Sequence, residues 1–174
     1  MHHQGSLDGL CGIYAAINGI SLMTKIDTAA LFSYIIQHMR DRLSAVMLQG
    51  LRSPQMRVLV VDVCRRFCIA HNIPLNYRIC YASSLDEYWQ WLQNHVAEHG
   101  PGSVILGVDE HWTCIKRITT RTILLADSNN WFRLYRRHVS IGTDAQHQVF
   151  PKATFLLRID YDREEEADEE AQLR

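Results

Sequence analysis

The amino-acid sequence predicts an α+β protein whose first half is helical and whose second half is an antiparallel β-sheet. Over roughly the first hundred residues, apolar side chains recur every three or four positions, the period of an amphipathic helix. After Gly102 the pattern changes to short β-branched and aromatic runs separated by turns. No linker rich in Pro, Gly or Ser divides the chain, so we predict one domain over residues 1–159 and an acidic tail over residues 160–174.

The length and composition are those of a single globular domain. The chain has 174 residues, of which 47% are hydrophobic and 21% charged, which excludes collagen-like, disordered and disulfide-scaffold proteins. No apolar run approaches the ~18 residues of a membrane span, so no membrane partner is expected. The N-terminal residues lack the basic and then apolar order of a secretory signal, and a cytoplasmic protein is therefore predicted.

Two helices are predicted before residue 51. The first begins after Asp8, which can cap it, and carries an apolar stripe at Leu10, Ile13, Tyr14, Ile17 and Ile20. The second begins at Asp27 and Thr28, which have the pattern of an N-cap, and is expected to run unbroken to Gly50. Its apolar face is predicted to comprise Leu31, Ile35, Met39, Leu43 and Val46.

Two further helices complete the first half. Pro54 can open a third helix, which is expected to end near Asn72. Ser84 and Glu87 form the pattern of a capping box, so a fourth helix is predicted from Ser84 to about Glu98. Strands are predicted at 77–81, 104–108, 112–118, 122–126, 132–135 and 149–159.

The net charge of −1 is unevenly distributed along the chain. Residues 160–174 contain eight acidic residues and two Arg, whereas the preceding residues carry an excess of five positive charges. We interpret the tail as a solvated segment, with masking of a basic groove as the alternative. The bases form no stripe interleaved with aromatic residues, so nucleic acid is not an expected partner. Arg133, Arg136 and Arg137 are predicted to form a basic rim that could recognise an acidic partner.

Five cysteines are present, an odd number in a chain without a secretory signal, which favours reduced thiols over disulfides. We expect four of them to be buried core residues: Cys64, Cys68, Cys80 and Cys114. Their spacing does not form the paired motifs of a zinc site, and no cofactor or metal is predicted.

Cys11 is different because it lies at the start of the first predicted helix, between glycines at positions 9 and 12. The helix dipole and the unpaired amides of a first turn stabilise a thiolate, which is the nucleophilic form of cysteine. Cys11 is therefore the candidate nucleophile, although a buried cysteine in such a position is often only structural.

His111 and Asp127 are the candidate partners of Cys11. His111 stands between two predicted strands, and a neutral histidine beside a thiol can accept its proton. The turn at Thr119–Arg121 would join two antiparallel strands and bring Asp127 back beside His111. A carboxylate in that place fixes the tautomer and orientation of the imidazole, with Asn129 as the alternative if Asp127 points away.

These residues resemble the pattern of the papain-like cysteine peptidases. The resemblance spans residues 4–131, and its nearest relatives look like the compact bacterial branch similar to bacteriocin-processing peptidase domains. It is carried by Gln4, by Cys11-Gly12 at the start of a helix, by His111-Trp112 on a strand, and by Asp127-Ser128 with Trp131 close behind.

The resemblance implies a papain-like fold and a role for each of these residues. Cys11 would attack a carbonyl carbon, His111 would serve as the base, and Asp127 would hold His111. The side chain of Gln4 and the backbone N–H of Cys11 would bind the oxyanion. Six residues separate Gln4 from Cys11, one more than in the family's pattern, so the loop must bulge if Gln4 is the donor.

The sequence therefore predicts a thiol hydrolase that cleaves a peptide or isopeptide bond in a protein or peptide substrate. Deamidation or transglutamination of a glutamine side chain uses the same acyl-enzyme and is the alternative within enzymes. A catalytically silent interaction module is the alternative of another class. Because no pro-segment precedes Cys11, activity would be restrained by substrate choice, a regulatory protein partner or genetic context.

His95 and His99 belong to a His-x-x-Glu-His sequence that matches the inverted zinc-peptidase pattern. No downstream helix offers a third ligand, and a histidine near a helix C-terminus is favoured by the helix dipole. We interpret this segment as a solvated helix end.

Overall fold

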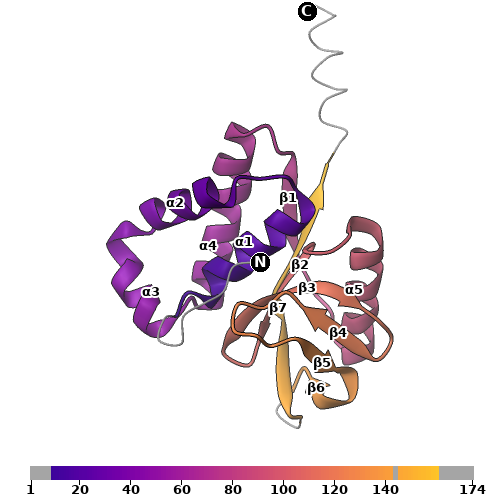
Figure 1. The fold of residues 1–174 in the computed structure, drawn as a ribbon. Helices are drawn as coiled ribbons and strands as arrows, with labels where there is room; N and C mark the ends of the chain where they lie inside the picture. Colours follow the sequence, from indigo (N-terminus) through magenta and orange to yellow (C-terminus); the bar gives the residue numbers. More distant parts are fainter. Residues whose placement is uncertain (1–8, 143–144, 161–174) are drawn as a thin grey trace, which may run out of the picture.

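The computed structural model describes residues 9–142 and 145–160, and these form an α+β fold with a helical half beside a sheet (Figure 1). The helical half contains α1 (Cys11–Met23), α2 (Thr28–His38), a 3₁₀ turn (Arg40–Arg42), α3 (Leu43–Gln49) and α4 (Ser53–Asp62), which continues as a π-helical segment (Val63–Cys68). The second half contains β1 (Leu75–Ile79), α5 (Leu85–His99), β2 (Val104–Val108), β3 (His111–Ile118), β4 (Thr122–Leu125), β5 (Arg133–Tyr135), a 3₁₀ turn (Arg136–His138), β6 (Val139–Ser140) and β7 (His147–Ile159).

The sheet has the strand order β1-β7-β2-β3-β4-β5, with every neighbouring pair antiparallel. The short strand β6 pairs in parallel with the start of β7. Because β7 is long, it pairs with β1 near its end and with β2 along its middle, and so joins the two halves of the chain. None of the described helices is long and apolar enough to span a membrane.

Two hydrophobic cores lie on opposite faces of the sheet, as Figure 1 shows by the placement of α1–α4 and α5. Side chains alternate along a strand, so Ile105 packs with the α1–α4 core while Val104 and Leu106 pack with the α5 core. Tyr88 and Trp89 of α5 are fully buried in the second core. This double coverage explains why every residue of β2 is buried.

The predicted helix from Asp27 to Gly50 is not continuous, and that prediction is wrong. Asp27 does cap α2, because its Oδ1 accepts hydrogen bonds from the N–H groups of Ala29 and Ala30. The chain leaves the helix at Met39, turns through 40–42 and resumes as α3. The break redirects α3 toward the segment before α1, where the Met47 carbonyl accepts a hydrogen bond from the Gly9 N–H at 2.7 Å.

The other predicted elements lie close to their expected positions. The first strand spans residues 75–79 rather than 77–81. Ser84 caps α5 by accepting a hydrogen bond from the Glu87 N–H, as predicted. The carboxylate of Glu87 accepts hydrogen bonds from the N–H and hydroxyl of Ser83 at 2.8 and 2.7 Å.

Asp160, the first residue of the predicted acidic tail, is bonded to the body of the protein. Its N–H donates to the Pro74 carbonyl at 2.8 Å, and its carboxylate accepts from Asn76 at 3.1 Å. Residues 161–174 lie outside the described residues, so the prediction of a solvated tail falls on a part of the chain that the structure does not describe.

Gly9 positions the chain just before Cys11 and has no room for a side chain. A Cβ atom there would lie 2.6 Å from both the Gly50 nitrogen and the Val46 carbonyl oxygen, which are backbone atoms that cannot rotate away. We expect Gly9→Ala to lower the free energy of unfolding by about 1–3 kcal/mol, as overpacking does. Urea unfolding measures the change. Gly142→Ala is the matched control, because a Cβ at Gly142 meets nothing within 4 Å, and an equal loss in both variants would contradict the prediction.

Candidate active site

Cys11 is the first residue of α1 and is 6% exposed. The N-cap residue is Leu10, and Asp8, the residue predicted to cap this helix, lies outside the described residues. The N-terminus of α1 nevertheless places Cys11 in the first turn, where the helix dipole favours negative charge. The N–H of Cys11 lies outside the intrahelical hydrogen-bond ladder, because the first four amides of a helix have no partner in it.

His111 begins β3, directly after the turn that joins β2 to β3. Asp109 in this turn has a positive φ of 54°, a conformation that costs energy for a residue other than glycine. Its carboxylate is held by the N–H of Gln148 at 2.7 Å and by Nδ1 of His147 at 3.0 Å. These two contacts with β7 stabilise the turn and thereby the position of His111.

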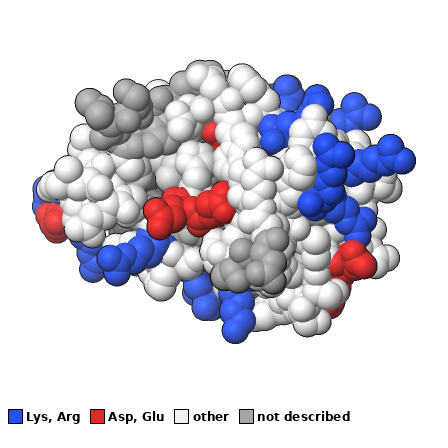
Figure 2. All heavy atoms as spheres, turned by 90° about the horizontal axis from the view of Figure 1, so that it is seen from below, with Lys and Arg blue, Asp and Glu red and all other residues white. Residues whose placement is uncertain are grey.

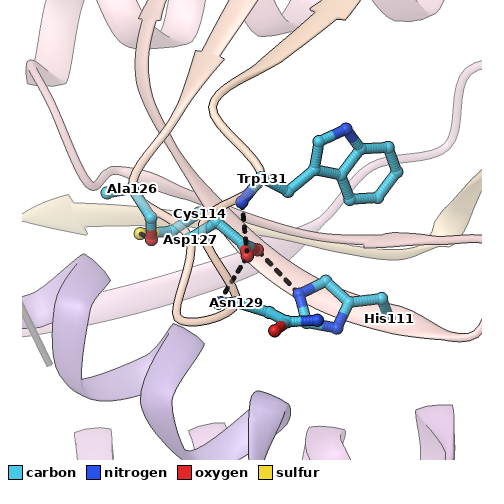
Figure 3. Close-up of polar contacts among 6 residues, drawn as sticks. All are labelled: His111, Cys114, Ala126, Asp127, Asn129 and Trp131. Carbon is cyan, nitrogen blue, oxygen red and sulfur yellow. Dashed lines mark hydrogen bonds and ion pairs between the residues drawn. The ribbon is translucent and has the colours of Figure 1, made fainter. Parts of the chain in front are cut away.

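Asp127 follows β4 and is only 1% exposed. Because β3 and β4 form an antiparallel hairpin, Asp127 returns to the end of β3 where His111 lies, and its Oδ2 is 2.7 Å from Nε2 of His111 (Figure 3). Its Oδ1 accepts hydrogen bonds from the N–H groups of Asn129 at 2.7 Å and Trp131 at 3.3 Å. Asp127 therefore points at His111, and Asn129 acts through its backbone rather than as the alternative orienting side chain.

The two charged groups shift each other's pKa. Burial is the largest influence on His111 and lowers the pKa, but hydrogen bonds to Asp127 and Cys11 and their charges outweigh it and raise the pKa of His111 to about 9. Burial likewise acts to raise the pKa of Asp127, but the hydrogen bond to His111 and its positive charge hold that pKa below the ordinary value of 3.8. The pair is thus stabilised as imidazolium and carboxylate.

His111 also interacts with the side chain of Cys11, which contributes to the raised pKa of His111, because α1 packs along β3. Nε2 of His111 is occupied by Asp127, which leaves Nδ1 as the ring nitrogen for the thiol. When Nε2–H donates its hydrogen bond to Asp127, the lone pair of a neutral ring is on Nδ1, where it can accept the thiol proton. In this arrangement His111, held by Asp127, can take the proton of Cys11 and so generate a thiolate.

Leu51 connects the helical half to the sheet at this site, and sequence reasoning missed it. Its carbonyl oxygen accepts a hydrogen bond from the indole N–H of Trp112 at 2.6 Å, next to His111 on β3. Its side chain packs against Gly12, where an added Cβ would come within 2.9 Å of the Leu51 Cδ1 atom. One residue between α3 and α4 thus contacts the neighbours of both Cys11 and His111. No local sequence signal marks a loop carbonyl for such a role.

The indole ring of Trp131 lies beside the His111–Asp127 ion pair. The centroid of its ring system lies 6.2 Å from that of His111 and 4.9 Å from that of His147 (Figure 3 shows Trp131 with His111 and Asp127). This indole limits solvent access to His111, whose side chain is 21% exposed. Because a lower local dielectric strengthens a hydrogen bond between charged groups, Trp131 stabilises the His111–Asp127 pair.

A cleft of about 430 Å³ lies beside His111, between the α3–α4 connection and the sheet. Figure 2, seen from below Figure 1, shows acidic side chains near the middle of that face of the molecule. The cleft is lined by Gln49, Leu51, Arg52, Ser53, Gly107, Asp109, Glu110, His111, Trp112, Phe150 and Ala153. Its walls combine apolar surface with hydrogen-bonding groups, as ligand sites do.

Gln4 lies outside the described residues, so the structure does not place the predicted oxyanion donor.

The other four cysteines are free and buried, as expected. Cys114 is the nearest of these to the candidate site in sequence and contacts the Ala126 carbonyl at 3.4 Å, but burial raises the pKa of its thiol to about 12. A thiol of this kind is not a nucleophile near neutral pH.

The interpretation of His95 as part of a solvated helix end is wrong. His95 is 2% exposed, its Nε2 lies 2.7 Å from the Leu157 carbonyl, and burial lowers its pKa to about 4. The cause is that α5 packs its whole length against the sheet, including its last turn. Within residues 9–142 and 145–160, no group of three or more His, Cys, Asp or Glu side chains could hold a metal ion.

The structure thus brings together three of the four predicted site residues, each from a different element. Cys11 comes from the start of α1, His111 from the start of β3 and Asp127 from the end of the β3–β4 hairpin. Comparisons of the chain with protein family models, curated proteins and solved structures find no match, so the chemistry of the site has to be inferred from its geometry.

Proposed function

We propose that this protein is a papain-like thiol hydrolase that cleaves a peptide or isopeptide bond in a protein substrate. The observation that carries the proposal is the contact of His111 with Asp127 on one side, at 2.7 Å, and with Cys11 on the other. A helical half that supplies a cysteine and a sheet that supplies a histidine and a carboxylate also support a papain-like arrangement.

The proposed reaction begins with transfer of the Cys11 proton to Nδ1 of His111. The thiolate sulfur attacks the carbonyl carbon of the scissile amide, and the N–H of Cys11 at the helix N-terminus stabilises the developing oxyanion. His111 then delivers the proton to the leaving nitrogen as the C–N bond breaks, which leaves a thioester. Water, deprotonated by His111, hydrolyses the thioester and restores the thiol.

Asp127 does not take up a proton in this scheme. Two backbone N–H groups and the His111 ring hold its carboxylate, and its pKa lies below the ordinary range. Asp127 therefore remains charged at neutral pH and stabilises the imidazolium that forms during the proton transfers. A buried carboxylate without this cation would be costly, which makes the charge on His111 and the charge on Asp127 mutually dependent.

The test is the pH dependence of Cys11 alkylation by iodoacetamide, followed by peptide mass spectrometry. We expect Cys11 of the unmodified chain to be alkylated at neutral pH faster than a free thiol, because His111 takes up the thiol proton. The buried Cys114 is the internal control and should remain unmodified in the folded protein. In His111→Gln the rate should instead rise about tenfold per pH unit up to the range of a free thiol.

An alkylation profile like that of a free thiol in the unmodified chain would contradict the hydrolase and favour an interaction module. Where Cys11 is activated, mass spectrometry of treated protein substrates separates hydrolysis from glutamine deamidation. Peptide cleavage creates new termini, whereas deamidation adds about one mass unit and leaves the chain intact.

A further inference from the structure

Strand β5 is the last strand in the path of the sheet, and among the described residues it pairs only with β4. The N–H of Leu125 donates to the Phe132 carbonyl at 3.0 Å, and the N–H of Arg136 donates to the Arg121 carbonyl at 2.9 Å. Successive residues of a strand alternate in the direction of their backbone groups. The N–H and C=O groups of Arg133 and Tyr135 therefore point away from β4, toward an edge that another strand could join.

The side chains of β5 alternate as well. Leu134 is buried in the core, whereas Arg133 and Tyr135 are exposed on the outer side. The guanidinium carbons of Arg133 and Arg137 lie 5.8 and 5.7 Å from the centre of the Tyr135 ring, and both are thus held over an exposed aromatic surface. Phe132, which is 63% exposed, extends this surface.

The charges around this edge are largely uncompensated. Arg121, Arg133 and Arg137 form no ion pair with a carboxylate among the described residues, whereas Arg136 pairs with Asp86. Figure 2 shows basic side chains gathered on the sheet half of the molecule. A cavity of about 730 Å³ opens there, lined by Leu85, Thr120, Arg121, Thr122, Tyr135, Arg136 and Arg137.

We propose that this β5 edge, comprising Arg121, Arg133, Tyr135 and Arg137, binds an extended acidic segment of a partner protein. The segment adds a strand beside β5 through the backbone groups of Arg133 and Tyr135, and its carboxylates accept hydrogen bonds from the three guanidinium groups. The unpaired backbone edge favours a polypeptide over a nucleic acid, because only a polypeptide supplies N–H and C=O groups at the strand repeat. None of the residues of this edge lines the cleft beside His111, so the proposal does not depend on hydrolysis.

The test uses the full chain and a short fluorescein-labelled peptide in which Glu alternates with Thr, measured by fluorescence anisotropy. We expect this peptide to bind at least about tenfold more tightly than the matched peptide with Gln in place of Glu. The double variant Arg133→Gln, Arg137→Gln should lose the same factor. The matched control is Arg57→Gln, Arg65→Gln, which removes two exposed arginines of the helical half that also lack an ion pair among the described residues, and binding should be unchanged.

Amide hydrogen exchange tests the strand addition itself. The bound peptide should slow exchange of the Arg133 and Tyr135 amides, while the Leu134 amide, which faces β4, should change little. Equal binding of the Glu and Gln peptides, or no protection of these two amides, would overturn the proposal.

Two other ligands of the β5 edge would give binding results that differ from those expected for an acidic partner segment. The first is a nucleic acid, tested with a single-stranded oligothymidylate. If this oligonucleotide binds more tightly than the Glu peptide, and its binding is lost in the Arg133→Gln, Arg137→Gln variant, the edge belongs to nucleic acid and the proposal is overturned. The triple variant Glu164→Gln, Glu165→Gln, Glu166→Gln removes charge from the acidic tail. Peptide binding that becomes about tenfold tighter in this variant would assign the edge to the chain's own tail instead.

Discussion

Replacement of Asp127 by Asn is expected to reduce acyl transfer by about 10²- to 10⁴-fold, although the side chain keeps its shape. The reason is that two backbone N–H groups fix the orientation of the side chain at position 127. The N–H groups of Asn129 and Trp131 both donate to Oδ1 of Asp127, so the carbonyl oxygen of an Asn would take that position. Its NH₂ group would then face Nε2 of His111, which would have to accept a hydrogen bond rather than donate one.

The consequence is the wrong tautomer of His111. A neutral ring that accepts at Nε2 carries its proton on Nδ1, the nitrogen that has to take the proton of Cys11. The variant also loses the negative charge that raises the pKa of His111, so the imidazolium is less stable. Both effects lower the amount of reactive thiolate.

The measurement is the initial rate of p-nitrophenolate release from p-nitrophenyl acetate, a small acyl donor that requires no knowledge of the natural substrate. The rate of Cys11→Ala is subtracted as the background. Asp41→Asn, which changes an exposed carboxylate paired with Arg40, is the control and should retain the full rate. An Asp127→Asn protein that is folded and reacts within about twofold of the unmodified chain would rule out this role for Asp127.

Stability should also depend on pH through the same pair. The pKa of His111 rises from 6.5 to about 9 on folding, so its contribution is complete below pH 6.5 and is lost as the pH rises through 9. The shift corresponds to about 3 kcal/mol of the free energy of unfolding. Asp127, with its lowered pKa, contributes above its unfolded value of 3.8 and loses that contribution as the pH falls further. Both shifts report one interaction, so their energies are not added.

Urea unfolding between pH 6 and pH 9.5 measures this effect. Both proteins carry Cys11→Ala, so that the coupled titration of this thiol is removed. The free energy of unfolding of the Cys11→Ala chain should fall by up to about 3 kcal/mol more than that of the Cys11→Ala, His111→Gln chain across this interval, because the remaining histidines and cysteines titrate in both proteins. Parallel curves for the two proteins would show that His111 has the same pKa in the folded and unfolded chain.

The elements and part of the site could be predicted because their signals are local. The period of apolar residues marks α1 and α5, and the change of pattern after Gly102 marks the strands. The His111–Asp127 contact is also accessible from sequence, since a short turn between consecutive strands makes their register almost independent of the rest of the fold.

Other features could not be read in this way because they depend on partners distant in the chain. The break after α2 arises because α3 has to reach Gly9, and periodicity alone carries no information about that contact. The sequence around His95 predicts a fraying helix end, but in the structure its ring contacts the carbonyl oxygen of Leu157 in β7, which is 62 residues away in the chain. The role of Leu51 rests on a backbone carbonyl, which every residue possesses.

The sequence by itself determined the α+β class, the order of the elements, and a cysteine, a histidine and an aspartate at element ends. Only the tertiary structure decided that α1 lies along β3, that Cys11 interacts with His111, and that β5 has a basic edge that no other described strand pairs with. The physical reason is that residue type and spacing set local conformation and side-chain chemistry, whereas the contacts between distant segments follow from how the two cores pack on the sheet.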